Sequence, residues 1–165
     1  GSMINLLPNP LLAGAAAALG HVDVELDTDA LVRRTYQQAG AGQATKAVNQ
    51  VMVAGINEAV CEALALGAKL GLDAQTLLPT LGSGAAANWF LDKRGATMLA
   101  GEFVPGFKCE HMLKDLRIAQ ATAEAVGIEH PTLRQALADY ATLVREGLGS
   151  SDTSALIALK LGPTP

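Results

Sequence analysis

The clearest hydrophobic pattern in the chain lies between Gln43 and Leu70. This stretch is rich in apolar residues and contains no proline and only two glycines, Gly55 and Gly67. Gly71 follows at a position suited to a C-terminal cap. The pattern predicts one helix of about 28 residues, which is long for an ordinary domain. We expect such a helix to run through the middle of the core or across a contact between subunits.

Shorter helical segments fill the rest of the chain, separated by glycine and proline. Pro131 suits the first residue of a helix, and Asp152 suits the cap of a final short one. No strand-rich region competes with these segments, so the predicted fold is all-α, a helical bundle built around one long central helix. The shorter helices are predicted at residues 74–81, 87–100, 109–126 and 131–146, and after residue 152.

The beginning of the chain is harder to interpret. Gly1 and Ser2 precede Met3 and read as a cloning scar. Residues 3–42 contain two helix-breaking prolines and form an N-terminal segment of uncertain structure. Residues 43–162 are predicted to form the helical domain.

Composition and charge exclude several classes of partner. The chain has 165 residues, of which 50% are hydrophobic and 4% aromatic, so one domain with a core of small side chains is expected. The net charge of −4 includes no basic block, and no nucleic acid partner is expected. The apolar run Leu11–Leu19 is too short to span a membrane and follows no basic segment, so we expect no membrane and a cytoplasmic location.

The cysteines and histidines do not form a recognisable site. Cys61 and Cys109 are far apart, which argues against a disulfide framework and against zinc, and both are expected to be reduced thiols within the core. The three histidines show no metal-ligand spacing, and no metal is predicted.

Polar residues form two stripes on the long predicted helix. At about 100 degrees per residue, Glu58, Glu62 and Lys69 share one narrow face, as expected for a solvent-facing stripe. The second stripe either meets water on another side of the helix or forms the polar wall of a ligand cleft, because buried amides and ammonium groups need partners. It consists of Lys46, Asn49, Gln50 and Asn57.

The second stripe has the chemistry needed to handle a hydroxyl or carbonyl oxygen. Lys46 lies just after the flexible Gly40-Ala41-Gly42, and its amine can exchange one proton with such an oxygen. Asn49 and Gln50 can hold a substrate by hydrogen bonds without adding charge. A Schiff-base enzyme that uses Lys46 as a nucleophile is a further possibility, which borohydride trapping would test.

Three motifs in the chain resemble those of the β-hydroxyacid dehydrogenases. Residues 40–50, Gly-Ala-Gly-Gln-Ala-Thr-Lys-Ala-Val-Asn-Gln, are similar to the family's Gly-rich segment and its Lys-x-x-Asn-Asn/Gln motif. Phe103-Val-Pro-Gly-Phe107 followed by Lys114-Asp115-Leu116 resembles a second family signature, and Asp152-Thr-Ser-Ala155 resembles the start of its last helix. The family includes 3-hydroxyisobutyrate dehydrogenase, tartronate semialdehyde reductase and, more distantly, 6-phosphogluconate dehydrogenase.

The resemblance implies a role for each matching residue. Lys46 matches the catalytic lysine, a general acid when a semialdehyde or keto acid is reduced and a general base in the reverse direction. Asn49 and Gln50 match substrate-orienting amides, and Gly42 and Gln43 belong to the same substrate-binding segment. Lys114 and Phe107 match residues near the nicotinamide of the cofactor. On periodicity alone, Lys114 would equally suit a solvent-facing position, and Phe107 a core position.

The family binds NAD or NADP on a Rossmann domain, and the sequence shows none. Such a domain needs a strand followed by Gly-x-Gly-x-x-Gly and a helix, which nothing here supplies. We therefore expect the chain to be inactive and to bind no cofactor by itself, although the complete enzyme uses NAD or NADP.

Two functions remain open after these observations. The first is the substrate-binding and dimerisation domain of an NAD(P)-dependent 3-hydroxyacid dehydrogenase that takes a small hydroxy acid or semialdehyde. The second is a non-catalytic helical dimerisation or binding module. A homodimer through the helical domain is expected in both, because a long apolar helix in a short chain leaves hydrophobic surface to bury.

Overall fold

The computed structural model of the chain describes residues 41–162, and the predictions made for residues 1–40 lie outside this range. Within it, six α-helices and one short 3-10 helix occur without any strand, which confirms the predicted all-α class. The helices are α3 (Ala41–Lys69), α4 (Ala74–Gly82), α5 (Trp89–Ala100), α6 (Cys109–Ala125), α7 (Pro131–Arg145), η1 (Thr153–Ala155, the 3-10 helix) and α8 (Leu156–Leu161).

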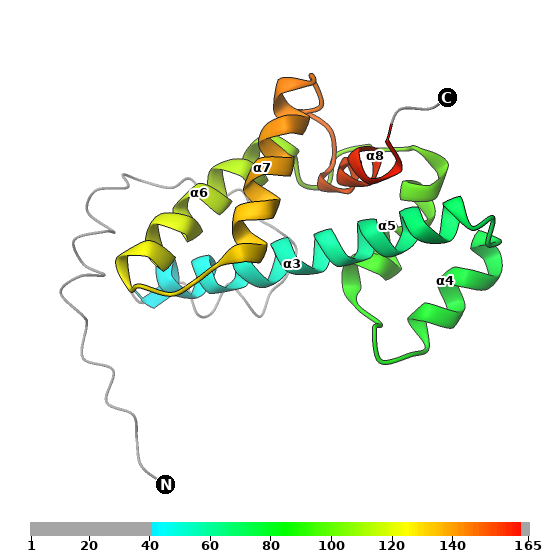
Figure 1. Cartoon of the computed structure of the whole chain (residues 1–165), viewed down its shortest axis with the longest axis horizontal. Coiled ribbons are helices and arrows are strands. Elements are labelled where there is room, and N and C mark those ends of the chain that lie inside the picture. Colours follow the sequence, from blue (N-terminus) through cyan, green and yellow to red (C-terminus); the bar gives the residue numbers. More distant parts are fainter. Residues whose placement is uncertain (1–40, 163–165) are drawn as a thin grey trace, which may run out of the picture.

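The long helix α3 forms the spine of the bundle, as predicted. It runs along the length of the molecule, with α6 and α7 packed near its N-terminal half and α8, α5 and α4 near its C-terminal half (Figure 1). The segment Gly42–Lys69 is long and apolar enough to cross a membrane by composition, and 44% of its most apolar window is buried inside the bundle. A helix in the core of a bundle can meet the same criteria of length and composition.

Local side-chain chemistry sets the ends of the helices. The Asp73 carboxylate accepts a hydrogen bond from the backbone N–H of Thr76 and caps α4. The Asn88 side chain caps α5 in the same way through Leu91 N–H, so this helix begins at residue 89 rather than at the predicted residue 87. Gly101 ends α5 with a φ of 71°, a left-handed conformation that favours glycine.

Both cysteines lie in the core as free thiols, as predicted. Cys61 and Cys109 are fully buried, and neither forms a disulfide. Burial raises the pKa of Cys109 to about 12 and raises that of Cys61 further, so both remain protonated at neutral pH. Among the described residues, no three His, Cys, Asp or Glu side chains are grouped so that they could hold a metal ion.

The predicted solvent stripe of α3 is wrong for Glu58. This residue is only 7% exposed, and its carboxylate lies 2.5 Å from the ammonium of Lys160 in α8. Lys160 also pairs with Asp139 of α7 at 2.6 Å and approaches Glu62 at 3.6 Å. A cation from another helix therefore pairs with a charge that periodicity within α3 assigns to solvent.

The second polar stripe does not simply meet water, because two of its members are buried. Asn57 is 1% exposed and donates a hydrogen bond to the Tyr140 hydroxyl at 2.9 Å. That hydroxyl donates in turn to the backbone carbonyl of Thr153 at 3.1 Å. Gln50, which is 7% exposed, contributes to a separate polar group near the start of α3.

Candidate active site

Helices α3 and α6 bring three polar side chains together at the N-terminal end of the bundle. The Lys46 ammonium lies 3.1 Å from one carboxylate oxygen of Asp115, and the Gln50 amide donates to the other at 3.0 Å. Lys46 and Gln50 are four residues apart on α3 and so share one face of it. Asp115 comes from α6, 69 positions beyond Lys46 in the chain.

The carboxylate of Asp115 explains why these side chains stay together. Asp115 is 6% exposed, because it lies on the face of α6 that also buries Met112, Leu116 and Ala119. A buried carboxylate is costly unless charged or amide donors satisfy it. Lys46 and Gln50 supply those donors, so the carboxylate fixes the positions of both.

The Lys46 side chain is held but not enclosed. It keeps 20% of its surface exposed, whereas the carboxylate that binds it keeps 6%. A lysine ammonium has three N–H donors, and the structure records one of them on Asp115. The remaining donors can reach an oxygen atom of a bound molecule. A single partly exposed ammonium on a buried anchor can both bind an oxygen atom and give it a proton.

The other predicted substrate residues take different positions. Asn49 is exposed, and its amide donates to the side-chain oxygen of Gln50 at 3.2 Å, which links it to the same network. Gly42 is buried and Gln43 is exposed, both in the first turn of α3. The structure therefore brings Lys46, Gln50 and Asn49 together, and it records no hydrogen bond between this group and Gln43.

The two predicted cofactor residues lie on α6 and on the loop before it. Lys114 is exposed and directly precedes Asp115, and within residues 41–162 no recorded hydrogen bond connects it to the Lys46 group. Phe107 is half-buried against the core, with its ring centroid 6.1 Å from that of His111.

Sequence reasoning missed Asp115 as a member of the site, although it quoted the residue within a motif. The signal was present in the spacing of α6. Asp115 lies three residues after Met112 and four before Ala119, and both of these are buried. An acidic residue on the apolar stripe of a helix requires a cationic or amide partner, and Lys46 lies at the facing end of α3.

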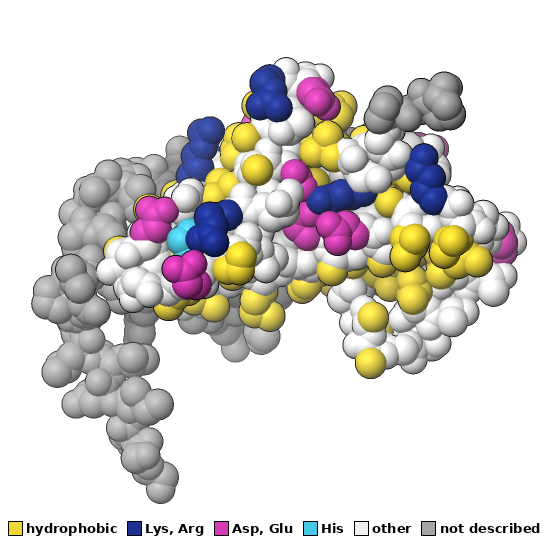
Figure 2. Space-filling view, in the orientation of Figure 1, with side chains coloured by type: hydrophobic (Ala, Val, Ile, Leu, Met, Phe, Trp, Pro, Cys, Tyr) yellow, Lys and Arg dark blue, Asp and Glu magenta, His cyan; other side chains and the backbone are white. Residues whose placement is uncertain are grey.

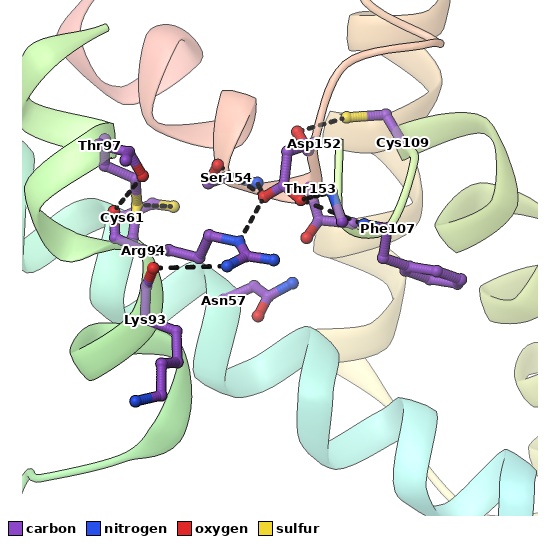
Figure 3. Close-up of polar contacts among 12 residues, drawn as sticks. Asn57, Cys61, Lys93, Arg94, Thr97, Phe107, Cys109, Asp152, Thr153 and Ser154 are labelled. Atoms are coloured by element: carbon purple, nitrogen blue, oxygen red, sulfur yellow. Dashed lines mark hydrogen bonds and ion pairs between the residues drawn. The ribbon is translucent and has the colours of Figure 1, made fainter. Parts of the chain in front are cut away.

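A second buried aspartate, Asp152, fixes the loop that carries Phe107 (Figure 3). Its carboxylate accepts backbone hydrogen bonds from Gly106 at 2.8 Å and from Phe107 at 3.1 Å. It also accepts from the backbone and hydroxyl of Ser154, at 3.1 and 2.7 Å, and from Arg94 Nε at 3.1 Å. The capping role predicted for Asp152 is confirmed by the first of the two Ser154 contacts.

The electrostatics of Asp152 follow from these contacts. Burial alone would raise its pKa, but the hydrogen bonds from Ser154, Gly106 and Phe107 outweigh this effect and lower the pKa below its ordinary value. Gly106 leaves the room that Arg94 needs, because a Cβ atom at Gly106 would lie 2.2 Å from the guanidinium. The loop is therefore built around an ionised carboxylate.

The described residues lack the fold that usually holds the pyrophosphate of a dinucleotide cofactor. Lys114 and Phe107 could contact the nicotinamide end, from the exposed position and the half-buried ring just described. Within residues 41–162 there is no strand followed by a Gly-rich turn and a helix to hold a pyrophosphate. The remainder of the cofactor needs a nucleotide-binding fold other than this bundle.

Known proteins of greater length contain a segment similar to this chain. The chain is 39% identical over 121 residues to an uncharacterized oxidoreductase of Bacillus subtilis, which covers 73% of this chain and 42% of the relative. It is 36% identical to the 2-hydroxy-3-oxopropionate reductase of Escherichia coli, which covers 74% and 42% respectively. The chain thus spans about two-fifths of the length of these relatives.

Solved structures show the same relationship. A 3-hydroxyisobutyrate dehydrogenase of Salmonella typhimurium superposes with a TM-score of 0.66 at 28% identity, over 72% of this chain and 41% of that one. The 3-hydroxyisobutyrate dehydrogenase of Mycobacterium tuberculosis, solved with L-serine, gives a TM-score of 0.64 at 31% identity, over 72% and 43%.

A family model covers nearly all of the described helices. It is described as the NAD-binding segment of NADP-dependent 3-hydroxyisobutyrate dehydrogenase, and it matches residues 40–160. The match begins at the glycine before α3 and includes Lys46, Asp115 and Asp152. With a polar site at one end and a bundle of the same fold as the solved relatives, the chain belongs to the 3-hydroxyisobutyrate dehydrogenase family, whose complete enzymes use NAD or NADP.

Proposed function

We propose that residues 43–162 form the catalytic-lysine and dimerisation domain of an NAD(P)-dependent 3-hydroxyacid dehydrogenase. In this proposal the substrate is a small hydroxy acid or the corresponding semialdehyde. The nucleotide-binding half is supplied by residues other than these, and the helical domain alone does not catalyse hydride transfer. The observation that carries the proposal is the partly exposed Lys46 ammonium held 3.1 Å from the buried carboxylate of Asp115.

The proposed role of Lys46 is proton exchange with the substrate oxygen. The ammonium form is the one that pairs with Asp115, and it can donate a proton to a carbonyl oxygen as the carbonyl carbon is reduced. In the reverse direction the neutral amine accepts the proton of the hydroxyl group. The nicotinamide cofactor, when bound, supplies or accepts the hydride. Lys46 itself is not consumed, because after reduction its amine takes a proton from water, and after oxidation its ammonium gives the proton to water.

The neighbouring residues orient Lys46 and the substrate in this proposal. Asp115 acts as a positioning residue, since its two oxygens hold Lys46 and Gln50 in one geometry. Asn49 is exposed and joined to Gln50, so its remaining hydrogen-bonding atoms can reach the substrate. Gly42 and Gln43 lie in the turn of α3 before Lys46, and Lys114 with Phe107 faces the nicotinamide.

A chimera with a complete relative tests this role of Lys46. The chain is joined to the nucleotide-binding half of the Bacillus subtilis relative, and oxidation of NADH or NADPH by small semialdehydes is followed by absorbance. Lys46→Met should lower kcat by at least about 100-fold, because a positioned proton donor contributes that much or more. Binding of the reduced cofactor should be unchanged. Lys69→Met, an exposed lysine on the same helix, is the matched control. Full activity of Lys46→Met would refute the proposal.

We also propose that the chain forms a homodimer through its helical domain and acts in the cytoplasm. The exposed apolar side chains of α3 support the dimer, because contiguous exposed apolar patches mark interaction surfaces. The same surface would serve a non-catalytic dimerisation module, which is the second candidate. The two candidates differ in their requirement for Lys46, since dimerisation alone does not depend on it.

A further inference from the structure

His111 lies on α6 between two residues of the proposed active site. Its ring centroid lies 6.1 Å from that of Phe107, with the two ring planes tilted by 57°. Four residues later on the same helix, the Asp115 carboxylate lies 3.1 Å from the Lys46 ammonium. Residues four apart share one face of an α-helix and are separated by about 6 Å along its axis. The imidazole therefore lies between the Phe107 ring and the pair that Asp115 forms with Lys46.

The side chain of His111 is accessible from this side of the helix. It keeps 39% of its surface exposed, whereas Asp115 keeps 6%. At about 100 degrees per residue, His111 lies at the edge of the α6 face that buries Met112 and Ala119, about 40 degrees from Asp115. A side chain at this edge can contact the Phe107 ring and also a molecule bound at Lys46.

Charge cannot distinguish one small semialdehyde acid from another, because each carries the same carboxylate. On the face of the molecule seen in Figure 2, Lys and Arg side chains are scattered singly and form no continuous basic patch. Discrimination between such substrates therefore requires a hydrogen bond to a group that only one of them has. A neutral imidazole donates from one ring nitrogen and accepts at the other, and a hydroxyl group also donates and accepts. The imidazole of His111 therefore suits a hydroxyl substituent of the substrate.

We propose that His111 is a specificity-determining residue of the proposed active site and binds a hydroxyl group on the carbon next to the reacting carbon. The inference rests on the proposed function and deepens it by naming the substrate class, a semialdehyde acid with a 2-hydroxyl group or the corresponding dihydroxy acid. The Phe107 ring on one side and Asp115 on the other restrict where the imidazole can lie. A site that hydrogen-bonds a substrate hydroxyl discriminates strongly against the analogue that lacks it, because the polar group of the site is then left unpaired.

The chimera with the nucleotide-binding half of the Bacillus subtilis relative tests this assignment with two matched substrates. The compounds 2-hydroxy-3-oxopropanoate and 3-oxopropanoate differ only in the hydroxyl group. His111→Leu should lower kcat/KM at least about 10-fold for the first and less than about twofold for the second, since one hydrogen bond to the hydroxyl is lost. His111→Gln keeps a donor and an acceptor and should retain most of the preference. Arg117→Leu, at an exposed position on another face of α6, is the matched control and should change neither value.

Equal losses of kcat/KM on both substrates in His111→Leu would overturn the proposal, and so would unchanged values on both. Thermal unfolding shows whether each variant is folded, and His111→Ala replaces the leucine variant if the latter does not fold. The ratio of the two kcat/KM values does not depend on Lys46, which acts on the carbonyl oxygen that both substrates share. A wrong assignment of His111 is therefore distinct from a wrong role for Lys46, which Lys46→Met tests on either substrate.

Discussion

Two buried aspartates, Asp115 and Asp152, differ in the number of hydrogen bonds that their carboxylates accept. Asp152 is 1% exposed and accepts five hydrogen bonds, from two loop N–H groups, from the backbone and hydroxyl of Ser154, and from Arg94. Asp115 is 6% exposed and accepts two, both from side chains of α3. Both carboxylates lie in apolar surroundings, and both come from the second half of the chain.

This difference distinguishes Asp152, which stabilises the fold, from Asp115, which holds the side chain of Lys46. All the donors of Asp152 belong to segments that it joins, so its hydrogen bonds are used entirely in holding the fold. One donor of Asp115 is the ammonium of Lys46, which keeps donors free and 20% of its surface exposed. A buried anion that holds a partly exposed cation is suited to present that cation to a ligand, at some cost in stability.

The largest expected effect is the loss of the Asp152 anchor. Asp152→Asn cannot accept from all five donors, and its amide places N–H groups against them. We expect the free energy of unfolding to fall by about 3–5 kcal/mol, as when one partner of a buried charged network is removed. Urea denaturation of the two proteins measures this change. A loss below about 1 kcal/mol would show that the network is not an anchor.

In the wild type, protonation of the Asp152 carboxylate at low pH should also reduce stability. Its folded pKa lies below the ordinary value of 3.8, so its contribution to stability is present above that value and is lost as the pH falls through the folded pKa. Asp152→Asn should lack this part of the acid-induced loss. Unfolding curves at a series of pH values below about 5 compare the two proteins.

A smaller effect is expected at Asp115. Asp115→Asn keeps the size of the side chain but removes the charge that pairs with Lys46, and we expect a loss of about 1–2 kcal/mol. In the chimera, the decrease in kcat, expressed as a free energy of activation, should exceed the loss of free energy of unfolding, since Lys46 loses its orientation. An equal decrease in kcat for Asp139→Asn, a carboxylate remote from Lys46, would argue against a positioning role.

A third carboxylate, Glu58, should respond in the opposite direction. Burial raises its pKa despite the nearby Lys160, so the folded state binds the proton more tightly than the unfolded chain. That stabilisation is present at low pH and is lost as the pH rises through the folded pKa. Glu58→Gln should therefore lack this part of the pH dependence of stability, which unfolding curves between about pH 4 and pH 7 would show. Glu62→Gln, at a side chain that is 65% exposed, is the matched control.

A loss similar to that of Asp115→Asn is expected at Lys46 itself. Lys46→Met keeps the length of the side chain but leaves the buried Asp115 carboxylate with Gln50 as its remaining recorded donor, and we expect a loss of about 1–2 kcal/mol. Thermal unfolding of the full chain measures it. A loss as large as that of Asp152→Asn would place Lys46 among the structural groups and would remove the contrast between the two aspartates.

The helices could be predicted from the sequence because their boundaries depend on local chemistry. Pro131 begins α7 at its first residue, and Gly71 and Gly127 take positive φ values directly after helical segments. The α3 helix begins at Ala41 and ends at Lys69, within two residues of the prediction. The predicted start of α5 was wrong by two residues, since Asn88 acts as a cap and the prediction included Ala87 and Asn88 in the helix.

The partners of polar residues could not be predicted in the same way. Periodicity shows which residues share a face of one helix, but it does not show which side chain another helix brings to that face. Glu58 was placed in solvent because Lys160 lies 102 positions later, and the Asn57 partner Tyr140 lies 83 positions later. The family resemblance implies a catalytic role for Lys46, which stays a prediction, and only the packing of α6 on α3 revealed its partner Asp115.

The contact between Trp89 and Arg94 has a practical consequence. Trp89 is the single tryptophan of the chain, and its ring lies 5.5 Å from the guanidinium that pairs with Asp152. The intrinsic fluorescence of the protein therefore arises beside the Asp152 anchor and far along α3 from Lys46. The emission of Trp89 should change when the loop before Phe107 detaches from Asp152. Binding of a ligand near Lys46 should leave the emission unchanged. The fluorescence of Trp89 therefore reports the local unfolding of the end of the bundle that contains Asp152.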